Sequence, residues 1–211
     1  MDKDKIREIV CRLLDDNINK TKCENEIPIE SSARHVHLCQ SDIDKLFGLG
    51  YRLTPKKDLS QPGQFLCEER VELVTGKSEI SNVAILGPVR SKTQVEISIT
   101  DARVLKINPP IHLSGNLDCA EDIFIISGKK MIEAKTSVIV AQNHIHMTPE
   151  DADKLGVYDG QCVRIQVNSD RAVIFDKVPI RIDKNFKLAM HIDFDEANGC
   201  NLTKNGFGRI L

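Results

Sequence analysis

Aromatic residues are scarce in this chain: its 211 residues include two Tyr, seven Phe and no Trp. A platform on which nucleic-acid bases stack needs such side chains, so the composition disfavours a single-stranded nucleic-acid ligand. A basic surplus is also lacking, because 29 Lys and Arg face 31 Asp and Glu and the net charge is -2. Binding to a phosphate backbone normally requires that surplus. We therefore expect no nucleic-acid partner.

Long apolar runs are lacking too. None approaches the roughly 18 residues that would span a bilayer, so we expect no membrane partner. The opening segment MDKDKIREIVCRLLDD carries acids, and it has neither the apolar stretch nor the small-residue cleavage site of a signal peptide. The seven cysteines are odd in number and form no CxxC pair, which favours reduced thiols over a disulfide framework. These absences predict a cytoplasmic protein.

Two nucleotide-binding motifs are missing, GxGxxG and GxxxxGKS/T, so a dinucleotide fold or a phosphate-binding loop has no support. Beyond residue 30 the chain instead contains short runs rich in Val, Ile and Phe, such as VAILGP, TQVEISIT, SVIVAQ and QCVRIQV. Gly, Pro, Asn and Asp separate these runs, as they separate short strands. The spacing predicts small β-barrels with brief helices rather than a doubly wound α/β sheet.

Residues 4–18 predict an amphipathic helix, because their apolar side chains recur at steps of three and four. The polar segment that follows ends at Pro28 and resembles a linker. Two interpretations are open: a helix docked on its own domain, or a detachable segment that binds a partner. The residue pattern by itself favours the first.

An internal repeat is the most informative feature of the sequence. Residues 34–46 read RHVHLCQSDIDKL, and residues 143–155 read NHIHMTPEDADKL. In the second copy Thr148 and Pro149 suit the start of a helix. A second match aligns EISITDA at 96–102 with HIDFDEA at 191–197, so that Glu96 and His191 occupy equivalent positions. Each half therefore offers an HxH pair and one further ligand.

An HxH pair on a strand directs both imidazoles to one face, because strand side chains alternate. Two such imidazoles and a carboxylate form a common zinc ligand set, with zinc–nitrogen distances of about 2.0–2.1 Å. Five of the six histidines fall in the repeat, and His112 alone stands outside it. The alternative is a duplicated fold whose histidines only pack. The metal-ligand candidates are His35, His37, Glu96, His144, His146 and His191.

Arg90 closes the run VAILGPVR, six positions before Glu96. A guanidinium beside a dication can hold phosphate through two parallel hydrogen bonds, so Arg90 is a candidate phosphate-binding residue. Its alternative role is that of an exposed strand arginine. Arg34 also precedes an HxH pair, but Asn143 occupies the matching position of the second copy.

Five segments resemble those of the PduL-type phosphotransacylases, also called phosphate propanoyltransferases: SSARHVHL, GQFLCEERVEL, GPVRSKTQVEIS, NHIHMTPEDA and MHIDFDEANG. The resemblance runs in order from about residue 30 to about residue 200. It implies a mainly β fold of two repeated small β-barrel domains capped by short helices, beside the N-terminal amphipathic helix. We expect the helix and linker over residues 1–26, the first barrel over 27–110 and the second over 111–211, with an approximate boundary that the chain can cross.

The resemblance also implies two zinc ions between the barrels, one held by His35, His37 and Glu96, the other by His144, His146 and His191. Arg90 would be the catalytic, phosphate-binding arginine. Coenzyme A, as substrate or product, would contact Ser32, Lys57, Leu86 and Asn198. Asn143 and His112 stand where the family more often has Arg, which changes the fixed positive charge available for anions.

The implied reaction converts a short-chain acyl-CoA, propanoyl-CoA or acetyl-CoA, and phosphate into acyl phosphate and free coenzyme A. The family's N-terminal extension often directs the enzyme into a bacterial microcompartment. By resemblance, the chain would lie there, with shell or core proteins and further copies of itself as partners. Two alternatives stay open: a metal-dependent hydrolase, and a non-catalytic, metal-stabilised binding protein associated with a microcompartment.

Overall fold

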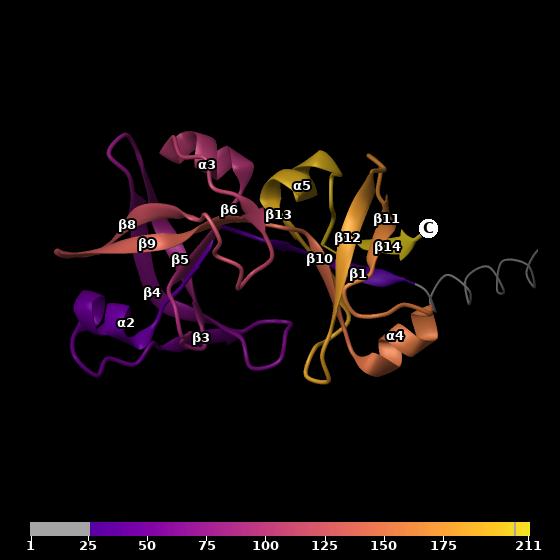
Figure 1. The fold of residues 1–211 in the computed structure, drawn as a ribbon, viewed down its shortest axis with the longest axis horizontal. Helices are drawn as coiled ribbons and strands as arrows, with labels where there is room; N and C mark the ends of the chain where they lie inside the picture. The colour runs from indigo at the N-terminus through magenta and orange to yellow at the C-terminus, as the bar shows by residue number, and fades with distance from the viewer. Residues whose placement is uncertain (1–25, 205) are drawn as a thin grey trace, which may run out of the picture.

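The computed structural model describes residues 26–204 and 206–211, so the helix expected over residues 4–18 lies outside the described part. Two β-barrels lie side by side, with α3 and α5 on one side and α2 and α4 on the opposite side (Figure 1). The mainly β fold with few short helices is as expected from the sequence. No helix in the described residues is long and apolar enough to cross a bilayer.

The first barrel closes through six strands in the order β4-β5-β2-β6-β9-β8, and β8 pairs again with β4. Two short strands extend this sheet, since β3 pairs with β4 and β7 pairs with β9. The strands are β2 (His35–His37), β3 (Pro55–Asp58), β4 (Phe65–Val74), β5 (Glu79–Gly87), β6 (Gln94–Ile97), β7 (Ile111–His112), β8 (Glu121–Ser127) and β9 (Lys130–Ala141). The helices are α2 (Gln40–Phe47) and α3 (Ile99–Leu105).

The second barrel closes in the order β1-β13-β10-β12-β11-β14. Its strands are β1 (Ile27–Ser32), β10 (His144–Met147), β11 (Cys162–Asn168), β12 (Ile174–Ile182), β13 (Ala189–Asp193) and β14 (Phe207–Ile210). The helices are α4 (Pro149–Leu155) and α5 (Phe194–Gly199). Each barrel has its own core of buried aliphatic side chains, centred on residues such as Ile85 and Val95 in the first barrel and Ile145 and Ile165 in the second.

The strands do not divide between the barrels at residues 110 and 111. β1 belongs to the second barrel, because it lies between β13 and β14. β8 and β9 belong to the first, because β8 pairs with β4 and β9 with β6. The chain therefore crosses between barrels twice, after β1 and after β9. Alternating hydropathy identifies each of these strands but not the distant strand that it pairs with.

The repeat in the sequence corresponds to a repeat in the strand pairing. β2 runs antiparallel to β6 with His35 opposite Glu96, and β10 runs antiparallel to β13 with His144 opposite His191. Each HxH strand also pairs in parallel with one neighbour, β5 or β12. Capping boxes start α3, α4 and α5, so the chain turns sharply out of the site-bearing strands. Thr148 forms one of these caps, with Pro149 in the first turn, as expected.

Candidate metal centre

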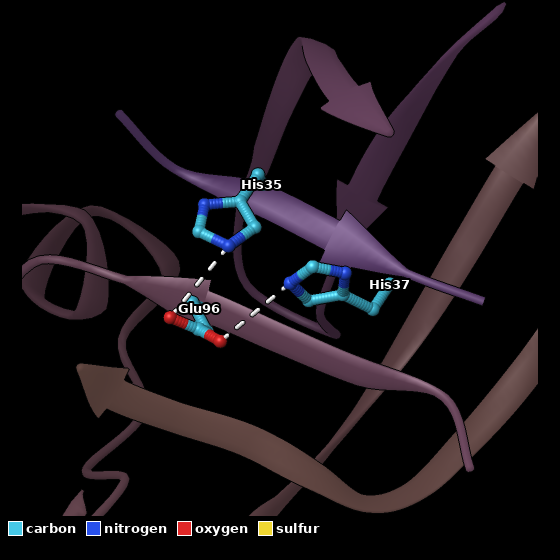
Figure 2. A group of neighbouring side chains, drawn as sticks. All are labelled: His35, His37 and Glu96. Atoms are coloured by element: carbon cyan, nitrogen blue, oxygen red, sulfur yellow. Dashed lines mark ion pairs between the residues drawn. The ribbon is translucent and has the colours of Figure 1, made fainter. Parts of the chain in front are cut away.

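Three side chains of the first barrel converge on one point (Figure 2). His35 and His37 project from β2 toward Glu96 on the neighbouring strand β6, and ligand atoms of all three lie within 4.8 Å of one another. The His35 Nε2–Glu96 Oε2 distance is 3.6 Å, and the His37 Nε2–Glu96 Oε1 distance is 3.7 Å. All three residues are buried. Two imidazoles and a carboxylate at this separation suit a transition metal.

Backbone carbonyls orient both imidazoles. The Nδ1–H of His35 donates to the Ala33 carbonyl at 2.8 Å, and that of His37 donates to the Leu86 carbonyl at 3.2 Å. A carbonyl only accepts hydrogen bonds, so these partners assign the proton of each neutral ring to Nδ1. In the neutral form of each ring, the Nε2 lone pair faces Glu96 and can bind a cation.

Glu96 is held as an ionised carboxylate. Burial alone would raise its pKa, but the neighbouring His35 and His37 and the Ser114 hydroxyl keep that pKa well below the usual range. The Ser114 Oγ donates to Glu96 Oε1 at 2.7 Å, and the Gln94 amide donates to the same oxygen at 2.6 Å. Burial lowers the pKa of His37 to about 3, so this ring is neutral at pH 7. Burial opposes protonation of His35 too, but Glu96 outweighs it and raises the His35 pKa.

The second barrel brings three imidazoles together in the same way. The ring centroids of His144 and His146 lie 4.6 Å apart, those of His146 and His191 4.9 Å, and those of His144 and His191 5.3 Å. The His144 Nδ1–H donates to the Gln142 carbonyl at 2.9 Å, which repeats the bond between His35 and Ala33. Burial lowers the pKa of His144 and of His191 to about 4 and that of His146 to about 2. All three rings are therefore neutral at pH 7.

The surroundings of His146 fit a bound metal ion. Both of its ring nitrogens are buried, and neither has a hydrogen-bond partner in the described residues. An unsatisfied buried polar group costs about 1–3 kcal/mol. A cation bound to one nitrogen would relieve part of this cost, so the three neutral rings fit a metal ion in chemistry as well as in position.

Both histidine sets open onto one cleft of about 330 Å³ between the barrels. His35, His37 and Glu96 line it from the first barrel, and His144, His146 and His191 line it from the second. The structure therefore brings together all six residues that the repeat singled out.

Arg90 lines the same cleft. Its Nη1 donates to the Ser114 Oγ at 2.9 Å and lies 4.0 Å from Glu96 Oε1. A single hydroxyl thus links the arginine to the carboxylate. Within residues 26–204 and 206–211 the other guanidinium donors make no hydrogen bond, so they can serve an anion. Arg181 on β12 is a second cationic residue of the cleft.

The four residues expected to contact coenzyme A separate into two pairs. Ser32 and Leu86 line the cleft. Lys57, on β3, and Asn198, on α5, are exposed and are not among the residues that line it. Coenzyme contact by any of the four remains a prediction.

Several further residues of the cleft lie outside the set that the sequence predicts. The Gln61 side chain crosses from the first barrel, donating to the Lys187 carbonyl at 2.9 Å and accepting from the Lys187 N–H at 3.1 Å. Its amide nitrogen also lies 3.2 Å from His191 Nε2. Phe186 stacks on His146 with ring centroids 4.0 Å apart. These residues and Arg181 lie outside the repeat. Only Gln61 has a local signal, the Pro- and Gly-containing segment that predicts a loop.

The family model and the curated relatives that match this chain agree on one family. The family model for phosphate propanoyltransferase matches residues 28–203. The phosphate propanoyltransferase of Leptotrichia buccalis is 46% identical over 210 residues, covering 100% of this chain and 99% of the relative. That of Enterococcus faecalis is 49% identical over 188 residues, covering 89% of each chain. That of Thermotoga maritima is 48% identical over 180 residues, covering 85% of this chain and 86% of the relative.

These matches span both barrels and include every residue of the two histidine sets. The chain therefore belongs to the phosphate propanoyltransferase family, whose members are acyltransferases.

Proposed function

We propose that this acyltransferase interconverts a short-chain acyl-CoA and phosphate with acyl phosphate and free coenzyme A, and that it works with two zinc ions. Propanoyl-CoA is the first candidate substrate, because the relatives are named phosphate propanoyltransferase, and acetyl-CoA is the second. One observation carries the proposal: six buried or half-buried ligand candidates from two barrels face a single cleft that also contains Arg90.

His35, His37 and Glu96 would hold one ion, and His144, His146 and His191 the other. When bound, zinc supplies Lewis-acid polarisation of a thioester carbonyl and an affinity for thiolate sulfur. The chain's own contribution is to present five imidazoles and one ionised carboxylate at fixed positions. Because the pKa of Glu96 is held low, this carboxylate has no proton to give at pH 7 and acts as an anionic ligand.

Arg90 would bind and orient phosphate for attack on the thioester. Ser114 fixes the position of the guanidinium while it also donates to Glu96, so one side chain aligns both groups. Holding two reactants in the correct geometry lowers the entropic part of the barrier. Arg181 adds positive charge to the same cleft and favours anionic substrates there.

Ser32 and Leu86 would contact coenzyme A inside the cleft, and Lys57 and Asn198 would contact the parts that extend beyond it. Outside this site, residues 1–26 would direct the chain to the shell or core proteins of a bacterial microcompartment. The chain would also form a homo-oligomer. Deleting residues 1–26 should leave acyl transfer intact and abolish co-purification with compartments.

The test of the proposed reaction is phosphate dependence. Purified protein with propanoyl-CoA should release free thiol only when phosphate is present, and acyl phosphate should form in equal amount. A hydrolase with the same ligand set would release thiol without phosphate, because water would be its acceptor. A binding protein would release none. The variant Arg90→Ala should lose phosphate-dependent release, whereas Glu79→Gln, on an exposed position of β5, should retain it.

A further inference from the structure

We infer that the two half-sites hold their cations unequally: His35, His37 and Glu96 form a tight half-site, and His144, His146 and His191 form a labile one. The inference deepens the proposed function and rests on the metal centre that it includes. Its biological meaning is that the supply of free zinc would control occupancy of the second half-site alone.

Charge is the first reason. The repeat places Glu96 and His191 at equivalent positions, each opposite the first histidine of an HxH strand. The tight half-site therefore has a buried carboxylate where the labile one has an imidazole, which binds a metal ion without bringing a negative charge. A buried charge attracts a dication with little screening. Arg90 and Arg181 both line the cleft, so positive charge is present beside both half-sites and the carboxylate is the charge that distinguishes their ligand sets.

Glu30 does not compensate for the missing carboxylate. Its Oε2 lies 3.9 Å from His191 Nδ1, but its side chain is 38% exposed. Solvent screens such a charge strongly. The Ser60 hydroxyl also donates to the same oxygen, which reduces its attraction for a cation. Glu96 also acts on this half-site, from the far side of the cleft, but it lies within the ligand cluster of the first.

Support from neighbouring groups is the second reason. Glu96 accepts two side-chain hydrogen bonds, and a carbonyl orients His37. His146 is the equivalent of His37, and its strand neighbour Arg181 is the equivalent of Leu86. In the described residues, however, neither ring nitrogen of His146 has a hydrogen-bond partner. Loss of such supporting partners typically costs 10–100-fold in metal affinity.

Competition for a ligand atom is the third reason. The Gln61 amide nitrogen lies 3.2 Å from His191 Nε2 and donates to that lone pair. The backbone of Lys187 holds the amide in place through two further hydrogen bonds. A cation that uses Nε2 must displace this amide. In the tight half-site, carbonyls occupy Nδ1 of both histidines, and their Nε2 atoms face Glu96.

A matched pair of substitutions tests the inference on the full-length chain. Zinc-loaded protein is equilibrated with increasing concentrations of a competing chelator, and bound zinc per chain is measured by elemental analysis. The wild type should lose its ions in two steps. His146→Ala removes a ligand of the labile half-site, so the remaining ion should leave only in the later step. His37→Ala removes a ligand of the tight half-site, so the remaining ion should leave in the earlier step. We expect about 10–100-fold between the two dissociation constants.

His191→Glu supplies the converse test, because it gives the second half-site the ligand set of the first. The earlier step should then move to higher chelator concentration. Thermal unfolding of each metal-free variant confirms that its fold is intact. Release of both wild-type ions in one step, or tighter retention in His37→Ala than in His146→Ala, would overturn the inference. Since the readout is bound metal, absence of acyl transfer would refute the proposed reaction and leave this result unaffected.

Discussion

Glu196 occupies the position at which the first half of the repeat has a charge pair and the second half does not. Replacing Glu196 by Gln should stabilise the protein, and the gain should grow as pH rises. In the first half, Arg34 pairs with the buried Asp101 at 2.9 Å. At the equivalent positions of the second half, the Asn143 amide donates to Glu196. A neutral amide compensates a buried carboxylate less than a guanidinium does.

Burial raises the pKa of Glu196 to about 7, and the nearby negative charges of Asp193 and Asp195 raise it further. The hydrogen bonds that Glu196 accepts lower the pKa but do not cancel this increase. An acid whose pKa is raised by folding binds more protons in the folded state. Its stabilising contribution is complete below the unfolded pKa, near 4.5, and is lost as pH rises through about 7. At about 1.4 kcal/mol per pKa unit, the loss has an upper bound of about 3.5 kcal/mol, part of which falls below pH 5.

The measurement is denaturant unfolding of metal-free wild type and Glu196→Gln at pH 5, 6, 7 and 8. The free energy of unfolding of the variant relative to wild type should rise across this range by up to about 3 kcal/mol. Asn143→Arg should produce a similar rise by restoring the charge pair of the first half, whereas Glu79→Gln should produce none. A difference that stays constant with pH in both variants would show that folding does not raise the pKa of Glu196.

Three further predictions concern single side chains. Arg90→Lys should raise the KM for phosphate at least about tenfold, because lysine cannot make two parallel hydrogen bonds. The KM for acyl-CoA should change little, and equal changes in both constants would argue against a phosphate-specific role. Gln61→Ala should lower the free energy of unfolding by about 1–3 kcal/mol, because the Lys187 N–H and carbonyl each lose a partner, and chemical denaturation would measure it. Ile145→Ala, fully buried in the second core, should cost about 2–5 kcal/mol in the same assay, and a cost near zero would contradict the packing.

Local sequence patterns predicted much of the fold. The aliphatic runs correspond to strands, and the Thr148-Pro149 pair starts a helix. What the patterns could not predict was barrel membership. β1 closes the second barrel through β13 and β14, which lie at the other end of the chain. Strand closure depends on long-range pairing, and the alternation of β1 is compatible with either barrel.

The candidate site was predictable where the repeat reached it. Equivalent positions in two copies identified both HxH pairs and matched Glu96 with His191, and the pairing register places them together. Gln61, Ser114 and Phe186 were not predictable in this way. Each has a common residue type in a segment outside the repeat, and only the three-dimensional arrangement brings it to the cleft.

In the proposed function, imidazoles from both barrels bind metal ions that acyl transfer requires. Its most direct test is to measure bound zinc and phosphate-dependent thiol release from propanoyl-CoA on the same sample, before metal removal, after it, and after zinc is restored. We predict two zinc ions per chain at the start, loss of thiol release in the metal-free protein, and recovery as zinc returns. Undiminished phosphate-dependent release from protein shown to contain no metal would show that acyl transfer does not require these metal ions.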